Sequence, residues 1–275
     1  MISYFKESFR RKKARRYTRE YPAVVSKFNL EKDGLVEFAN WDNPLVSQIS
    51  LSQAKIDFFK QFIKEGDLVI DIGANTGDTT VPMGIAAGKT GITLGFDPNP
   101  YVYKILKANA NLNKERTNIV AYPCAISTEE NEFYFISSEA SFANGGISLT
   151  KDSYHGKFIA PEKIKGVNLH QLLSTEYSSK LDDFSFIKID TEGYDKEIIK
   201  SISDLISKYK PVIVAESFGK SSNEAKMELF EVIDIHGYDI FYFEDFELGT
   251  ETKEIKSAQE MTNWNNTIDI YAIPK

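Results

Sequence analysis

The chain has 275 residues, and its 42% hydrophobic content is enough to form the core of one large domain or two small ones. A net charge of −7 argues against nucleic acid as the main partner, and no apolar run reaches the roughly 18 residues of a membrane-spanning helix. The single cysteine, Cys124, excludes an internal disulfide and a multi-cysteine metal site. Because the basic N-terminus lacks the apolar segment of a signal peptide, we expect a cytoplasmic protein.

Residues 1–20 are strongly basic, with eight Lys/Arg and two Glu. Their net charge is +6, so the rest of the chain carries −13. Ile2, Phe5 and Phe9 stand beside these charges, and the segment could therefore lie on the anionic inner face of a membrane. A solvated helix that packs its apolar residues on the domain is the simpler interpretation.

The N-terminal 65 residues are expected to form a helical extension, with one helix over 51–64 that Gly66 ends. The second domain, 66–275, alternates strands with helices. Strands are expected at 68–72, 92–96, 119–123, 132–136, 184–190, 212–217, 238–243 and 267–273, and helices after Thr76 and at 100–113, 195–208 and 223–236. This alternation predicts an α/β fold with a mostly parallel sheet, and the last two strands should pair antiparallel at one edge.

The segment 68–77, Leu-Val-Ile-Asp-Ile-Gly-Ala-Asn-Thr-Gly, is typical of a strand that turns into a helix beneath a nucleotide-like ligand. The next strand ends at Asp97, where a carboxylate can hold the two hydroxyls of a ribose. Asn75 stands where the dinucleotide motif has its second glycine, which argues against a pyrophosphate. The pattern favours S-adenosylmethionine; a nicotinamide-dependent oxidoreductase and a catalytically idle cofactor-binding scaffold are the alternatives.

Five stretches resemble the FkbM family of S-adenosylmethionine-dependent methyltransferases: Val-Ile-Asp-Ile-Gly-Ala-Asn-Thr-Gly (69–77), Gly-Phe-Asp-Pro-Asn-Pro (95–100), Pro-Cys-Ala-Ile-Ser (123–127), Phe-Ile-Lys-Ile-Asp-Thr-Glu-Gly-Tyr-Asp (186–195) and Pro-Val-Ile-Val-Ala-Glu (211–216). The resemblance implies a class I methyltransferase fold, Rossmann-like, with seven strands and an antiparallel last strand. It also implies O-methylation of a saccharide, glycoconjugate or small-molecule acceptor. The predicted cofactor contacts are Asp71, Gly73, Asn75, Thr76, Gly77, Asp97, Pro98, Asn99, Cys124, Ala125 and Asp190.

Methyl transfer to a sugar hydroxyl needs help in removing a proton, either from a base or from a metal ion. Asp190 and Glu192 follow a central strand and are the predicted catalytic acids. Glu216 ends the next strand, and the three carboxylates together could hold a divalent cation such as Mg²⁺. The sequence does not separate a base from a metal ligand.

The segment 137–157 is rich in Ser, Gly and Asn and has no periodicity. A structureless loop of this length in a compact domain is typical of a lid over an active site. His155 lies within it and is the third catalytic candidate.

Overall fold

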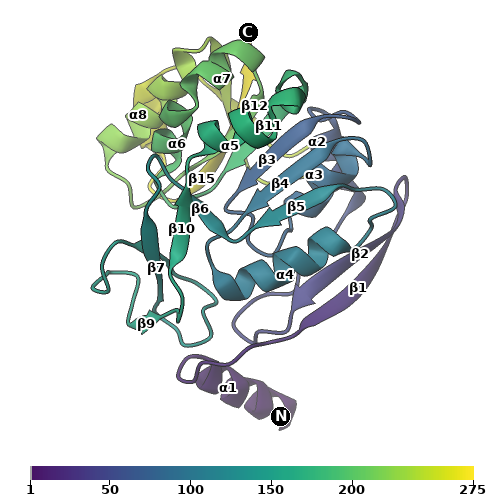
Figure 1. The fold of residues 1–275 in the computed structure, drawn as a ribbon, viewed down its shortest axis with the longest axis vertical. Coiled ribbons are helices and arrows are strands. Elements are labelled where there is room, and N and C mark those ends of the chain that lie inside the picture. Colours follow the sequence, from purple (N-terminus) through teal and green to yellow (C-terminus); the bar gives the residue numbers. More distant parts are fainter. Residues whose placement is uncertain (1) are drawn as a thin grey trace.

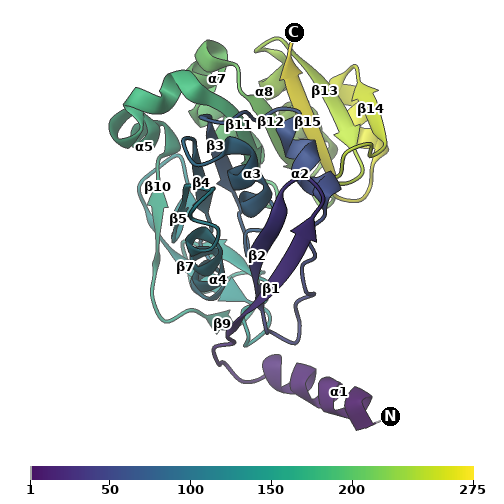
Figure 2. The ribbon, with the colours of Figure 1, turned by 90° about the vertical axis from the view of Figure 1, so that its right-hand side faces the viewer.

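The computed structural model describes residues 2–275 and shows one large sheet with helices on both faces (Figures 1 and 2). Its eight strands lie in the order β14 (Thr252–Ile255), β13 (Tyr238–Phe243), β15 (Ile268–Pro274), β12 (Val212–Ser217), β11 (Phe184–Ile189), β3 (Leu68–Ile72), β4 (Ile92–Phe96) and β5 (Ile119–Tyr122). The run from β12 to β5 is parallel, and β15 is antiparallel between β12 and β13. The predicted fold class is confirmed. The antiparallel pair is not the outermost one, because β14 extends the edge beyond it.

The central strands are apolar because helices cover both faces of the sheet. All five residues of β3 are buried, as are the last four residues of β11. Two charged residues interrupt this pattern: Asp71 in β3 and Lys188 in β11, which are direct register partners. A buried charge needs a partner, so this pair marks the place where the sheet departs from a purely apolar core.

One face of the sheet carries α2 (Gln53–Lys60) and α3 (Thr80–Ala87), and the other carries α5 (Leu169–Glu176), α6 (Asp195–Ser201), α7 (Ser203–Tyr209) and α8 (Asn223–Asp234). The helix expected over 195–208 is thus two helices, divided at Ile202. Helix α4 (Pro100–Asn111), which follows β4, begins after Asn99. The Asn99 side chain accepts from the backbone N–H groups of Tyr101 and Val102. Asn99 is therefore the N-cap of α4.

The prediction that the N-terminal 65 residues form a helical extension is wrong in part, because the segment also contains two strands. Helices α1 (Ile2–Ala14) and α2 flank an antiparallel hairpin of β1 (Ala23–Leu30) and β2 (Gly34–Trp41). Gly34 supplies the turn with a φ of 64°, which favours glycine. Val36 and Phe38 of β2 share a buried cluster with Val81 of α3, so the hairpin packs directly on the main sheet's helical layer. The domain division at residue 65 stays a prediction.

A second, smaller sheet follows β5 and is formed by β6 (Cys124–Ile126), β10 (Ile164–Val167), β7 (Glu132–Ser137), β8 (Gly146–Ser148) and β9 (Phe158–Ile159). The segment 137–157, here called the flap, is therefore not structureless: β8 pairs antiparallel with β7. Within residues 2–275 no helix combines the length and the hydrophobicity required to cross a bilayer.

Candidate functional site

A cavity of about 820 Å³ lies where β3, β4 and β11 end, beneath the flap. This volume is in the range of small-molecule and cofactor sites. Most of the residues predicted from sequence as contacts line it: Gly73, Asn75, Asp97, Pro98, Asn99, Cys124, Ala125, His155, Asp190 and Glu192. Residues far apart in the chain are thus brought to one place by the parallel sheet.

The glycine turn forms the floor of the cavity. The N–H groups of Gly73 and Ala74 both donate to the carbonyl of Phe96, which joins the turn to the end of β4. Gly73 has a φ of 75°, and a Cβ on it would lie 2.0 Å from the carbonyl oxygen of Asp190. Only glycine allows the turn and Asp190 to approach this closely. Asn75 follows in the left-handed region with a φ of 46°.

Asp97 is held rigidly beside this turn. Its Oδ2 accepts from the Asn75 N–H at 2.9 Å, and its Oδ1 accepts from the Asn99 N–H at 2.8 Å. Burial raises the pKa of Asp97 to about 7, against the two backbone hydrogen bonds, which lower it. The carboxyl group is therefore fixed in position, with its charge sensitive to pH near neutrality.

Three residues predicted as direct cofactor contacts do not line the cavity: Asp71, Thr76 and Gly77. The Asp71 side chain is completely buried, and its Oδ2 accepts from the hydroxyls of Thr79 and Thr80 at 2.8 and 2.6 Å. It therefore supports the turn from behind. Thr76 and Gly77 lie on the far side of the turn; a Cβ on Gly77 would meet Leu106 of α4 at 3.2 Å.

Lys188 was not singled out from the sequence. Its side chain is only 5% exposed, and its Nζ lies 3.4 Å from Asp71 Oδ1 and 3.2 Å from Asp190 Oδ2. Burial alone lowers the pKa of this ammonium, but Asp190 and Asp71 outweigh it and raise the pKa above its usual range. Lys188 is thus a permanent cation that ties the glycine turn to the acid at the end of β11. A lysine inside an apolar strand was the signal that could have revealed it.

All three catalytic candidates line the large cavity. Asp190 is partly exposed and held by Lys188, whereas Glu192 is exposed and has a φ of 53°. His155 comes from the flap, where its ring lies over Gly146 and leaves no room for a side chain there. Burial lowers the pKa of His155 and the nearby Glu192 opposes that shift, so the imidazole is neutral at neutral pH and able to accept a proton.

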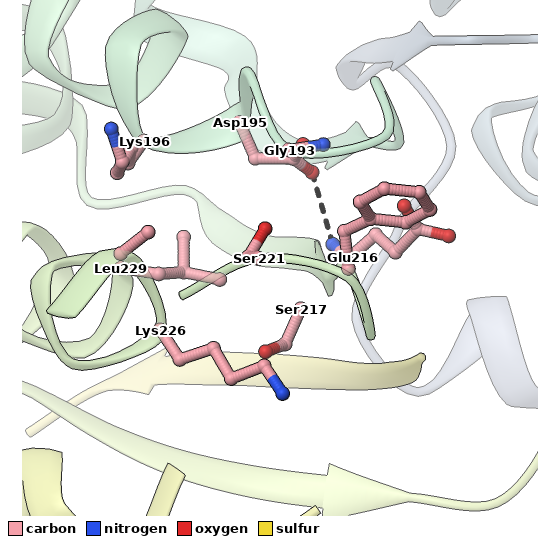
Figure 3. A pocket seen from close by; sticks show the side chains of 10 residues that line it. Gly193, Asp195, Lys196, Glu216, Ser217, Ser221, Lys226 and Leu229 are labelled. Carbon is pink, nitrogen blue, oxygen red and sulfur yellow. Dashed lines mark hydrogen bonds between the residues drawn. The ribbon is translucent and has the colours of Figure 1, made fainter. Parts of the chain in front are cut away.

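Glu216 does not line the large cavity. It lines a separate cavity of about 10 Å³ behind β12 with Ser217, Ser221 and Lys226 (Figure 3). Burial, with the surrounding acids, raises its pKa to about 8. Among residues 2–275 no three His, Cys, Asp or Glu side chains are arranged to hold a metal ion. The predicted metal set of Asp190, Glu192 and Glu216 is therefore not formed.

Asp195 is a second residue that sequence reasoning left without a role. Its Oδ2 accepts from the Thr191 hydroxyl at 2.7 Å, and its Oδ1 accepts from the Glu216 N–H at 3.0 Å, the dashed bond in Figure 3. Asp195 thereby fixes the loop that carries Asp190 and Glu192 to the end of β12. Its place in the 186–195 motif was the available signal.

The charged residues that line the large cavity are all acidic. Four carboxylates line it, and none of its lining residues in the described chain is Lys or Arg; the acids are Asp97, Glu129, Asp190 and Glu192. Such a cavity favours cationic or neutral ligands and disfavours phosphates. Cys124 contributes a small buried thiol, whose pKa burial raises to about 12, so it is not a reactive thiolate.

The strand order, with an antiparallel β15 between β12 and β13 and a cavity at the ends of β3 and β4, defines a class I methyltransferase fold. Residues 71–247 match the Methyltransferase FkbM domain, and the chain belongs to that family.

Three of the solved structures similar to this chain are methyltransferases, all at low sequence identity. A precorrin-6y C5,15-methyltransferase from Geobacter metallireducens is 13% identical with a TM-score of 0.42, covering 82% of this chain and 90% of that one. A SAM-dependent O-methyltransferase from Thermotoga maritima is 10% identical with a TM-score of 0.41, covering 92% and 78%. A methyltransferase FkbM from Methylobacillus flagellatus is 12% identical with a TM-score of 0.44, covering 79% of this chain and 50% of that one. No curated protein sequence matches.

Proposed function

We propose that this protein transfers a methyl group from S-adenosylmethionine to a hydroxyl of a saccharide or glycoconjugate. One observation carries the proposal: in an FkbM-family chain, a cavity lined by four carboxylates and by no Lys or Arg lies against the glycine turn and Asp97. A sulfonium cofactor brings a positive charge and no phosphate, so the donor set fits it. When bound, it supplies an electrophilic methyl group.

Asp97 is the residue proposed to hold the ribose. Because backbone N–H groups occupy one lone pair on each of its oxygens, the carboxylate can accept two further hydrogen bonds without rotating. Gly73 and Asn75 shape the floor, and Cys124 and Ala125 provide the small side chains beside it. Pro98 and Asn99 complete the wall, where Asn99 also anchors the start of α4.

The acceptor is proposed to enter from the flap side, where polar and aromatic side chains line the cavity, among them Asn144, Tyr154 and Tyr194. A neutral hydroxyl compound suits a wall without cations. Asp190, Glu192 and His155 line the same cavity and can orient a hydroxyl and accept its proton. The Lys188 ammonium pairs with Asp190 at 3.2 Å. Within residues 2–275, neither Glu192 nor His155 has a Lys or Arg within ion-pair distance.

The alternatives fit this cavity less well. A nicotinamide dinucleotide carries a pyrophosphate, for which the lining residues provide no positive side chain. An idle scaffold does not require three proton acceptors in the wall of one cavity. We also propose a cytoplasmic location, with peripheral contact to an anionic membrane through residues 1–20.

Two experiments test the proposal. Thermal unfolding with S-adenosylmethionine or with NADH should show a raised midpoint for the former alone, because a ligand that binds only the folded state stabilises it. Mass spectrometry of saccharides from cells with and without the gene should then show the loss of one methyl group at a defined hydroxyl. Stabilisation by NADH alone contradicts the proposal.

A further inference from the structure

Helix α1 stands apart from the main sheet and projects from the body of the protein (Figures 1 and 2). Its inner face is attached: Arg10 pairs with Asp42 at 3.1 Å, Arg11 Nε donates to the Pro44 carbonyl at 3.1 Å, and Ala14 is fully buried. These residues fall on one side of a helix that turns about 100° per residue. The helix therefore has a defined orientation on the body, with its other side outward.

The outward side combines aromatic rings with cations. Phe5 and Phe9 are four residues apart and share this side with Lys12 and Lys13. Phe9 is 59% exposed, and Tyr17, just beyond the helix, is 66% exposed. Among residues 2–275, Lys12 and Arg16 have no carboxylate within ion-pair distance, unlike Arg10 on the inner side. Lys13 lies over the Phe9 ring, 4.7 Å from its centre. Exposed rings among cations that have no carboxylate partner are the composition of a helix that lies in a membrane interface.

The C-terminal end of α1 is joined to the flap. Arg15 Nε donates to Glu139 Oε1 at 3.3 Å, and the Ala140 N–H donates to the Arg15 carbonyl at 3.3 Å. From there Phe142 stacks on Tyr101 with ring centres 4.6 Å apart, and its carbonyl accepts from the Asn99 side chain at 2.8 Å.

Asn99 in turn donates its N–H to Asp97 Oδ1. A continuous set of contacts thus runs from α1, through the base of the flap, to the carboxylate proposed to hold the ribose.

We propose that the outer side of α1 docks on an anionic lipid bilayer and that docking steadies the flap over the cavity through Arg15 and Glu139. The helix is 13 residues long, about 20 Å, so it lies along the surface and does not cross it. The body of the protein carries a net charge of −13 and is repelled by the same surface, which leaves α1 as the contact. The effect on the cavity rests on the proposed methyl transfer from S-adenosylmethionine, whereas the docking does not.

Cosedimentation of the full chain with vesicles tests the docking. We expect binding to phosphatidylcholine mixed with phosphatidylglycerol, none to phosphatidylcholine alone, and loss of binding at high salt. The double variant Lys12→Gln, Arg16→Gln should bind about 25-fold more weakly, since each cation near such a surface contributes about five-fold. Lys64→Gln, Lys114→Gln removes the same charge from exposed sites on the body and should bind as the wild type does.

Several results would overturn the docking: equal binding to both kinds of vesicle, no binding at low salt, or equal losses in the two double variants. Binding to polyglutamate but not to vesicles would also overturn it, and would indicate an acidic protein partner instead.

Glu139→Gln separates docking from its effect on the flap. This variant breaks the pair with Arg15 and leaves all the cations in place, so vesicle binding should persist. In the wild type, vesicles should slow hydrogen exchange at the flap amides 143–149 at least several-fold; in Glu139→Gln they should not. Equal protection in both proteins would overturn the coupling through Glu139. Failure of S-adenosylmethionine to bind any variant would count against the proposed function and leave the vesicle result standing.

Discussion

The Nζ of Lys188 lies 3.4 Å from Oδ1 of Asp71 inside the sheet, where the lysine side chain is 5% exposed and the carboxylate is completely buried. Removing the cation would leave this buried carboxylate without its countercharge, with only the hydroxyls of Thr79 and Thr80 still donating to it. We predict that Lys188→Met lowers the free energy of unfolding by about 3–5 kcal/mol.

Lys226 provides the matched control for urea unfolding. It is equally buried, but its Nζ donates to the Trp264 carbonyl, so Lys226→Met leaves a neutral group unpaired and should cost about 1–3 kcal/mol. Equal losses of unfolding free energy in the two variants would show that the ion pair with Asp71 contributes no more than the hydrogen bond of Lys226.

Gly73→Ala should destabilise the protein more than its backbone angle alone explains. Gly34→Ala is the reference, because Gly34 has a similar positive φ and nothing lies within 4 Å of its added Cβ. That variant should lose about 1–2 kcal/mol from the left-handed conformation. At Gly73 the Cβ also meets the Asp190 carbonyl at 2.0 Å, so the loss should be clearly greater. Urea midpoints compare the two, and equal losses would mean that the turn and Asp190 separate without cost.

The strands around this site could be predicted from the sequence because each is a short apolar run that ends in a turn. β3 and β4 were predicted with their observed bounds, since buried parallel strands leave a strong local signal. The β1–β2 hairpin could not be recognised in the same way. Its outer strand is largely exposed. Its stability comes from packing on α3 and from hydrogen bonds between Ala39 and Asn109 of α4, and both helices are distant in sequence.

For the acids of the site, the sequence signal was a position at or just after the end of a strand. Asp97, Asp190 and Glu192 have such positions and line the cavity, but Asp71 follows the same pattern and points behind the turn toward Lys188. Whether an acid such as Asp71 or Asp97 faces the cavity depends on the direction of its side chain and on the neighbouring strands, which the sequence alone does not give. Glu216 shows the same limit, because it also ends a central strand and lines a separate small cavity.

The catalytic proposal predicts different turnover rates for variants of the acids and the histidine that line the cavity. Asp190→Asn, Glu192→Gln and His155→Gln should be compared in kcat, and the one that removes the base should lose about 10²–10⁴-fold with cofactor affinity kept. Glu129→Gln is the matched control, since Glu129 lines the same cavity but does not follow a central strand. A normal rate in the first three variants would place the base elsewhere.

Glu216 makes stability depend on pH. Its pKa is raised from 4.5 to about 8, so the folded state retains a proton that the unfolded state has lost between these values. The stability that protonated Glu216 contributes to the folded state is fully present below pH 4.5 and disappears as the pH rises through about 8. Glu216→Gln should therefore gain stability relative to wild type at about pH 9 and little at about pH 4. A constant difference in urea midpoint across this range would refute the raised pKa.

The central claim is that Asp97 holds S-adenosylmethionine in this cavity, and titration calorimetry with the cofactor tests it most directly. Wild type should bind more tightly as the pH rises through about 7, because Asp97 then becomes a carboxylate. Asp97→Ala should bind about 1.5–3 kcal/mol more weakly and lose this pH dependence. Equal affinity in the two proteins, or an unchanged pH dependence in Asp97→Ala, would contradict the claim.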